Sequence, residues 1–307
     1  MSEFWQQIIN GLTLGSVYAL VALGYTLVYG LLELINFAHG AVVMWGGLVG
    51  LSLTKVFLSW GWPLSLALLL ALMFALLAGV FLGLLLERVA YRPLRKAPKI
   101  APLITGLGAS MVLEQVAALI WGRGYLSFSV EENIPSFHWG GVIVSAAQIA
   151  VLGIAFLVMW GLWELVERTS FGRAMRAVAQ DACVAELMGV NINAVIAWTF
   201  AIGAFLGALA GFMIVGYYGI GHYTMGFMLG LKAFTAAVLG GIGHMRGAMV
   251  GGLLLGVIEA LGAGYLGDWT HGYFGSNYKD VFAFMVLILV LVVHPQGLWG
   301  TRLREKV

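Results

Sequence analysis

The chain has 307 residues, of which 61% are hydrophobic and 10% are charged, and its formal net charge is +2. A soluble domain carries about 25% charged residues, so this composition excludes a globular enzyme, a disordered chain and a nucleic-acid-binding protein. It indicates a membrane protein, whose backbone polar groups must be satisfied within helices or a closed barrel. Barrel strands alternate apolar and polar residues, and the long unbroken apolar runs of this chain favour helices instead.

Four stretches without a charged residue mark the predicted spans most clearly. They lie between Glu3 and Glu33, between Lys55 and Glu87, between Glu132 and Glu164, and between Glu186 and Lys232. A span needs roughly 20 apolar residues, and each stretch is longer than that. We therefore predict an all-α, polytopic bundle of eight to nine transmembrane helices that forms one domain over residues 1–307.

The spans are predicted at about 8–30, 38–58, 64–86, 101–121, 141–165, 194–218, 226–243, 247–266 and 280–296. The segment 226–243 is short and rich in glycine, so it could instead be two re-entrant half-helices. That alternative leaves the number of spans and the side of the N-terminus open.

Positive charges are distributed unevenly among the predicted loops. Twelve of the 16 Lys and Arg residues fall in segments that would share one side of the membrane: Arg88, Arg92, Arg95, Lys96, Lys99, Arg168, Arg173, Arg176, Arg246, Arg302, Arg304 and Lys306. Only Lys55, Arg123 and Lys279 fall on the other side. Because cytoplasmic loops are enriched in Lys and Arg, we expect the first group and the C-terminus to be cytoplasmic.

Glycines recur at a spacing of four residues in several predicted spans. The series are Gly203/Gly207/Gly211, Gly79/Gly83, Gly226/Gly230, Gly247/Gly251 and Gly252/Gly256. Lipid tails provide no hydrophobic drive between helices, so small residues on one face allow close backbone contact. This interpretation as helix packing is favoured over a more specific function.

The predicted cytoplasmic loop over about 167–192 is longer than a connection between adjacent helices requires. Its middle is rich in alanine and is expected to form a short amphipathic helix. Gly189 suits the residue that follows the end of such a helix. The helix could lie on the membrane surface or dock on a cytoplasmic partner, and periodicity alone does not separate these alternatives.

Ionisable residues within spans are costly, so they are functional candidates by default. Lys232 and Glu259 are expected at a similar depth in neighbouring spans, which suggests an ion pair that either locks two helices or contacts substrate. Glu114 is expected at a comparable depth and could line the same cavity. Asn36 and His39, with Glu33, would share a helical face if 33–39 is helical, or would otherwise cap helices. The remaining His residues are scattered, so no metal site is expected.

Two stretches resemble a known family of membrane proteins. Ile35-Asn-Phe-Ala-His-Gly40 and Lys232-Ala-Phe-Thr-Ala-Ala-Val-Leu-Gly-Gly-Ile-Gly243 carry the resemblance, and further matching segments are 10–20, 87–95 and 172–177. The chain is similar to the inner-membrane permease subunits of bacterial high-affinity branched-chain amino-acid ABC transporters, the LivH type. The resemblance implies import of leucine, isoleucine and valine, and it implies no enzymatic activity.

The resemblance also implies partners. These are a second, LivM-like permease, two cytoplasmic ATPase subunits that bind the ATP, and a periplasmic amino-acid-binding protein. This agrees with the absence of a Gly-x-x-x-x-Gly-Lys-Ser/Thr phosphate loop in the sequence, because the chain then needs no cofactor of its own. The loop is then interpreted as an ATPase-coupling segment with Gly172, Arg173, Arg176, Asp181, Ala185 and Gly189 as its key residues.

An alternative from another class stays open at this point. The chain could be a self-sufficient, ion-coupled carrier or channel in which Lys232 and Glu259 serve the coupling and broken helices hold a small polar solute. In either case the candidate pathway residues are Asn36, His39, Glu114, Lys232 and Glu259. The sequence leaves the solute open, as well as whether the partner permease is identical or different.

Overall fold

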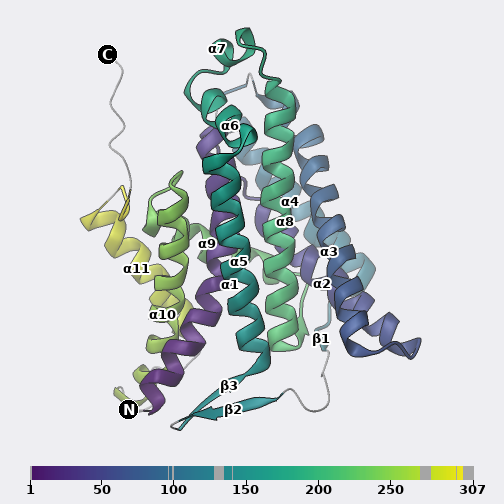
Figure 1. Ribbon diagram of the computed structural model, residues 1–307, viewed down its shortest axis with the longest axis vertical. Coiled ribbons are helices and arrows are strands. Elements are labelled where there is room, and N and C mark those ends of the chain that lie inside the picture. The colour runs from purple at the N-terminus through teal and green to yellow at the C-terminus, as the bar shows by residue number, and fades with distance from the viewer. Residues whose placement is uncertain are drawn as a thin grey trace. The chain divides into compact units, whose positions relative to one another are not determined.

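The computed structural model describes residues 2–95, 97–98, 100–127, 135–139, 141–269, 278–294 and 296–299 (Figure 1). The helices are α1 (Ser2–Leu32), α2 (His39–Ser59), α3 (Leu64–Leu86), the π-helical turn η1 (Glu87–Tyr91), the 3-10 turn η2 (Arg92–Leu94), α4 (Ile100–Trp121), α5 (Ala146–Arg168), α6 (Ser170–Gln180), α7 (Ala182–Leu187), α8 (Ile192–Tyr218), α9 (Met225–Gly240), α10 (Met245–Trp269) and α11 (Lys279–Val293). The strands are β1 (Leu126–Ser127), β2 (Ser136–Trp139), β3 (Val142–Ser145) and β4 (Ile220–Gly221).

Seven helices among the described residues are long and apolar enough to cross a membrane, namely α1, α2, α3, α4, α5, α8 and α10. Two shorter apolar helices, α9 and the Ala283–Val293 part of α11, coincide with the other two predicted spans. The all-α, multi-pass architecture is therefore confirmed, whereas the number of eight to nine spans stays a prediction. Over 225–240 the backbone is one continuous helix, so the two half-helices considered for this segment are not observed there.

The chain divides into two compact units of interleaved segments. The first contains 1–26, 132–159 and 232–307, and the second contains 27–131 and 160–231. Helices α1 and α5 each contribute to both units. The units are described separately below.

In the second unit, α2, α3 and α8 pack against one another through small residues. A Cβ atom added to Gly79 or Gly83 of α3 would lie 2.3 or 2.4 Å from the Cβ atom of Ala208 or Ala204 of α8. The predicted role of these glycines in close helix packing is confirmed. Helix α8 ends at Gly219, whose left-handed φ of 67° favours glycine.

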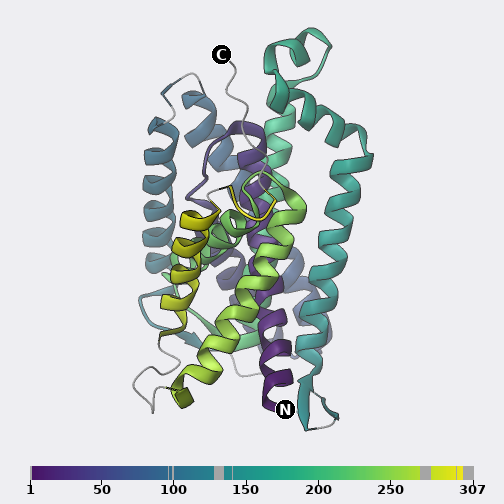
Figure 2. The same cartoon turned by 90° about the vertical axis from the view of Figure 1, so that its left-hand side faces the viewer.

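In the first unit, α1 and α10 also cross closely through small residues. A Cβ atom on Gly256 would lie 2.3 Å from the backbone of Gly15, and one on Gly252 would lie 2.4 Å from Cα of Ala19. Helices α10 and α11 lie side by side, as Figures 1 and 2 both show. Strands β2 and β3 form a hairpin, so residues 142–145 are not the start of the span predicted over 141–165.

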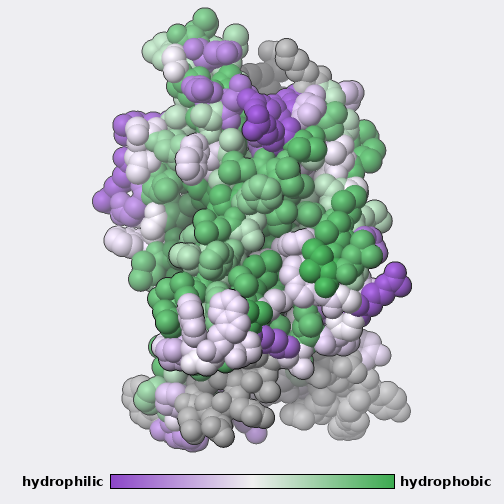
Figure 3. Space-filling view, turned by 90° about the vertical axis from the view of Figure 1, so that its right-hand side faces the viewer, coloured by the Kyte–Doolittle hydropathy of each residue, from purple (hydrophilic) through white to green (hydrophobic). Residues whose placement is uncertain are grey.

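The outward side of α3 is uniformly apolar. Leu69, Leu77 and Phe81 are 63%, 58% and 65% exposed. Figure 3 views the side of the molecule that carries α3, and apolar side chains cover the middle of it. In water such a surface would be strongly unfavourable, so its environment is the hydrocarbon of a bilayer.

The connection between α1 and α2 is not helical. Helix α1 ends at Leu32, and Glu33 has a positive φ of 52°. The condition under which Glu33, Asn36 and His39 would share one helical face is therefore not met. A Glu in the left-handed region ends the helix here as Gly or Asn would, at some cost in backbone strain.

Candidate functional site

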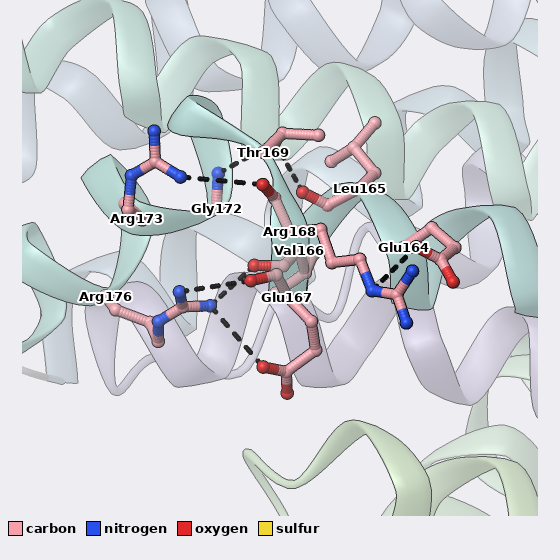
Figure 4. Close-up of polar contacts among 9 residues, drawn as sticks. All are labelled: Glu164, Leu165, Val166, Glu167, Arg168, Thr169, Gly172, Arg173 and Arg176. Carbon is pink, nitrogen blue, oxygen red and sulfur yellow. Dashed lines mark hydrogen bonds and ion pairs between the residues drawn. The ribbon is translucent and has the colours of Figure 1, made fainter.

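The joint between α5 and α6 is built for close contact (Figure 4). Thr169 is the N-cap of α6, and its Oγ1 accepts a hydrogen bond of 3.2 Å from the N–H of Gly172. A Cβ atom on Gly172 would lie only 1.8 Å from the carbonyl oxygen of Val166. Only glycine lets α6 start directly against the last turn of α5, which explains Gly172 at this point of the predicted coupling segment.

Two arginines of α6 turn back toward the C-terminal end of α5 (Figure 4). Nη1 of Arg176 donates to the carbonyl oxygen of Val166 at 2.5 Å and lies 3.9 Å from Oε2 of Glu167. Arg173 makes a longer contact of 3.5 Å with the carbonyl oxygen of Arg168. The last carbonyls of a helix lack intrahelical donors and carry partial negative charge, so cations are favourable there. Arg176 thus anchors α6 to α5.

The helix predicted in 172–189 is in fact two helices. Asp181 has an extended backbone, with φ −157° and ψ 106°, and it separates α6 from α7. Its Oδ1 accepts a hydrogen bond of 3.1 Å from the N–H of Val184. Asp at an N-cap satisfies one of the free N–H groups of the following helix, so this residue starts a new helix rather than continuing the old one. Gly189 follows α7 with a φ of 85°, as predicted for the residue beyond a helix end.

The end of this segment presents apolar side chains to solvent. Val184, Leu187 and Met188 are 54%, 82% and 80% exposed, whereas Ala185 is 3% exposed and packs inward. We call Val184, Leu187 and Met188 the α7 tip. The predicted coupling residues do not include these three. The signal was present as an apolar cluster beside the N-cap Asp181, but only the structure shows its exposure.

Helix α8 follows the segment directly and is tied to the end of α3. Asn193, in the first turn of α8, accepts a hydrogen bond of 2.7 Å from Nη1 of Arg95. The other guanidinium nitrogen of Arg95 contacts the carboxylate of Glu87, which is 3% exposed. Burial lowers the pKa of Arg95, and the neighbouring Glu87 carboxylate opposes that change. Arg95 thus lies at the same end of the second unit as the start of α8, which follows the predicted coupling segment. This agrees with the prediction that Arg95 and that segment share one side of the membrane.

Asn36 and His39 are both buried in the second unit, 5% and 2% exposed. Oδ1 of Asn36 accepts hydrogen bonds from the N–H of Ala38, at 3.1 Å, and from the hydroxyl of Tyr91, at 2.8 Å. Asn36 therefore holds the turn into α2 and joins it to η1. Its contact with a substrate stays a prediction, as does that of His39.

A buried charged cluster lies in the first unit. Nζ of Lys232 on α9 lies 2.7 Å from Oε1 of Glu259 on α10 and 2.5 Å from Oδ1 of Asp280 on α11. The hydroxyl of Tyr18 donates to Oε2 of Glu259 at 2.9 Å. The predicted pairing of Lys232 with Glu259 is therefore present. Asp280 was not predicted, although an acid at the start of the last apolar helix was a visible signal.

The cluster joins α9, α10 and α11, and two of its three charged side chains are buried. Lys232 is 5% exposed and Glu259 is 1% exposed. Buried charges are tolerated only when they are paired and hydrogen-bonded, as these are. Glu114 belongs to α4 of the other unit and is half-exposed, and its place beside the same cavity stays a prediction.

Comparisons with known proteins cover nearly the whole chain. Residues 7–291 match the family described as branched-chain amino acid transport system / permease component. The chain is 44% identical to the high-affinity branched-chain amino acid transport system permease protein BraD of Pseudomonas aeruginosa, over 99% of this chain and 98% of that protein. It is 42% identical to the permease protein LivH of Salmonella typhimurium, again over 99% and 98% of the two chains. A probable LivH of Methanocaldococcus jannaschii is 26% identical over 93% of this chain and 89% of its own.

Proposed function

Because the chain belongs to the family of permease components of branched-chain amino acid transport systems, we propose that it is one of two membrane-spanning subunits of an ATP-driven importer. The family consists of transport permeases rather than enzymes, and the ATPase is a separate subunit. The proposed substrates are leucine, isoleucine and valine, which the printed names of the relatives support as a class. The proposed partners are a second permease, two ATPase subunits and a periplasmic amino-acid-binding protein.

The proposed site of energy coupling is the α6–α7 segment. The observation that carries it is the α7 tip, where Leu187 and Met188 are 82% and 80% exposed on a segment fastened to α5 by Gly172 and Arg176. An apolar tip suits insertion into a groove of a partner protein. A rigid joint would pass a push on the tip to α5 and, through Asn193, to α8.

The proposed location is the bacterial inner membrane, with α6, α7 and the C-terminus in the cytoplasm. The grouping of Arg95 with the coupling segment at one end of the second unit supports this orientation. Arg123, assigned to the opposite side, lies near the other end of α8, where its carbonyl oxygen contacts Nε2 of His222 at 3.2 Å. The positive residues of the tail, Arg302, Arg304 and Lys306, lie outside the described residues.

The proposed pathway retains Asn36, His39, Glu114, Lys232 and Glu259 as candidates for polar contacts with the substrate. The burial and hydrogen bonds of Asn36, Lys232 and Glu259 support a structural role of these three residues at least as strongly. We propose that the whole chain acts as one permease domain. Selection of the substrate would lie largely in the binding protein, with only weak contacts along the path.

Substitution of the α7 tip tests the coupling proposal. In the importer reconstituted with its ATPase subunits, Leu187→Asp should abolish retention of the ATPase and reduce substrate-stimulated ATP hydrolysis at least tenfold. Gln180→Glu is the matched control, because it also adds a negative charge at an exposed position but lies outside the tip. If Leu187→Asp left ATPase retention and stimulated hydrolysis equal to those of the control, coupling through the tip would be wrong.

Reconstitution of the chain alone tests the alternative of a self-sufficient carrier. An ATP-driven importer should show no uptake of radiolabelled leucine into liposomes under an ion gradient without the other subunits. Uptake under those conditions would favour ion coupling through Lys232 and Glu259 instead.

A further inference from the structure

Tyr91, the last residue of η1, joins three neighbouring elements through one buried side chain. It is 2% exposed, and its ring centroid lies 5.2 Å from that of Phe200 on α8. A Cβ atom on Gly106 of α4 would overlap its hydroxyl oxygen, so glycine at this point of α4 leaves room for the hydroxyl. That hydroxyl donates to Oδ1 of Asn36 at 2.8 Å, in the connection before α2. All four residues belong to the second unit, so these contacts lie within one compact body.

The backbone is irregular at both ends of this hydrogen bond. In η1 the N–H of Arg92 bonds the carbonyl oxygen of Glu87, five residues earlier, which is the π-helical pattern. At the other end, the 33–38 connection begins with Glu33 at its positive φ of 52°. Single π turns within helices are frequent at functional sites, and left-handed residues other than glycine cluster at switch segments. A π turn can revert to α-helical bonding, which supplies the second arrangement that a switch requires.

The end of the 33–38 connection lies deep in the second unit. Helix α2 begins at His39, and a Cβ atom on Gly207 of α8 would lie 3.1 Å from Cε1 of that histidine. Gly207 comes 15 residues after Ile192, the start of α8, which corresponds to about 22 Å along the helix axis. Non-helical backbone at membrane depth is tolerated only where protein buries it or where it lines a water-filled path. A movement of this connection would therefore change the interior of the permease, which a polar substrate must cross.

Further contacts tie the first residue of η1 to the proposed coupling segment. Nη1 of Arg95 donates to Oδ1 of Asn193 at 2.7 Å, in the first turn of α8, and Nη2 of Arg95 contacts the carboxylate of Glu87. Helix η1 is therefore held at its first residue by the start of α8 and at its last residue by Asn36. A shift of the start of α8 would thus act on η1 before it reaches the connection into α2.

We propose that Tyr91 is a positioning residue of the transport cycle, whose hydrogen bond to Asn36 latches the 33–38 connection in the resting state and opens when the coupling segment moves. The proposal rests on the proposed function as a subunit of an ATP-driven importer. While the bond is made, Oδ1 of Asn36 also accepts the N–H of Ala38 at 3.1 Å, which fixes the start of α2. When η1 moves, Asn36 loses its tyrosine partner and the connection changes its path. Remaking a buried hydrogen bond then favours the return to the resting state.

Removal of the hydroxyl alone tests the latch in the importer reconstituted with its partner subunits. Tyr91→Phe should raise basal ATP hydrolysis, measured without amino acid, by about three- to tenfold, which is the effect of one hydrogen bond on an equilibrium. Substrate-stimulated hydrolysis should change much less, so its ratio to basal hydrolysis falls. Thr199→Val is the matched control, because its buried hydroxyl bonds the carbonyl oxygen of Val195 in the same helix, at 2.8 Å. Equal ratios in the two variants would overturn the proposal.

Labelling of the connection gives a measurement that a loss of stability alone does not move. Cys183→Ser first removes the single native cysteine. In that background, Phe37→Cys should react with a water-soluble maleimide about threefold faster or more in the complex trapped with ATP and vanadate than without nucleotide. Adding Tyr91→Phe should raise the rate without nucleotide towards the rate of the trapped complex. Thr54→Cys, at a buried position farther along α2, is the control for general loosening and should react slowly in both states.

The labelling rates separate failure of the latch from failure of the proposed function. A rate at Phe37→Cys that does not change with nucleotide, in a complex whose unmodified form takes up leucine with ATP, would overturn the latch alone. Absence of ATP-driven uptake by the unmodified complex would overturn the proposed function, and the latch with it.

Discussion

Nη1 of Arg95 donates a hydrogen bond of 2.7 Å to Oδ1 of Asn193, which joins the chain after α3 to the first turn of α8. Asn193 comes directly after the proposed coupling segment, and Arg95 also contacts the buried carboxylate of Glu87, the first residue of η1. Tyr91 of η1 donates in turn to Asn36 in the turn before α2. A displacement of α7 would therefore reach three helices of the second unit through these polar contacts.

The pairing of Arg95 with Glu87 predicts a dependence of stability on both partners. Arg95→Gln should lower the free energy of unfolding by about 2 kcal/mol, because Glu87 keeps its charge in a buried site without its cation. Adding Glu87→Gln should recover most of that loss, since the charge is then gone. Denaturation of the purified protein in detergent measures both variants, with exposed Arg92→Gln as the control. A double variant as unstable as Arg95→Gln alone would contradict this account.

The charged cluster of the first unit predicts unequal effects for its members. Lys232 lies near two carboxylates, so Lys232→Met should destabilise the protein by about 3–5 kcal/mol, because it leaves the buried Glu259 and the partly exposed Asp280 without their cation. Glu259→Gln should cost only about 1 kcal/mol, because Lys232 keeps Asp280 and the amide can still bond Tyr18. Thermal unfolding followed by fluorescence-detected size-exclusion chromatography measures the difference. The reverse order of stability would exclude the observed arrangement.

Substitution by alanine is expected to change the stability of the protein differently at two glycines. Gly256→Ala should destabilise the protein by about 1–3 kcal/mol, because its Cβ atom would meet the backbone of Gly15 at 2.3 Å. Gly153→Ala on α5 has nothing within 4 Å of its Cβ atom and should be neutral or slightly stabilising, since alanine favours helix. The yield of monodisperse protein after heating distinguishes them. Equal yields would mean that α1 and α10 do not cross at this contact.

The anchoring of α6 predicts different roles for its two arginines. Arg176→Ala removes the bond of 2.5 Å to Val166 and should loosen α6 by about 1 kcal/mol, which lowers substrate-stimulated ATP hydrolysis more than basal hydrolysis. Arg173→Ala removes only a contact of 3.5 Å and should change the ratio of stimulated to basal hydrolysis much less. Both rates are measured on the reconstituted importer. The anchoring role would be refuted by a larger effect of Arg173→Ala.

The helices of the membrane region could be predicted closely from the sequence. The charge-free run between Lys55 and Glu87 predicted 64–86, and α3 occupies Leu64–Leu86. The apolar segment 101–121, which contains only Glu114 as a charged residue, was also predicted as a span, and α4 occupies Ile100–Trp121. The pairing of Lys232 with Glu259 also followed, because two ionisable groups at one depth in neighbouring spans need each other. The break at Asp181 was missed because an alanine-rich segment has high helix propensity on both sides of it. A capping hydrogen bond that starts a second helix depends on one side chain, whereas helix propensity is judged over the whole segment.

The amino-acid sequence by itself determined that this chain crosses a membrane as helices, which glycines let those helices approach, and which family it belongs to. These properties depend on apolar content, on residue spacing and on short motifs, all of which are local along the chain. Only the tertiary structure decided that Arg176 faces α5 and that Leu187 and Met188 are exposed. Exposure and contact depend on which distant segments pack around a residue. In a membrane span, an apolar side chain is about equally stable against lipid or against protein, so its sequence does not reveal which of the two it contacts.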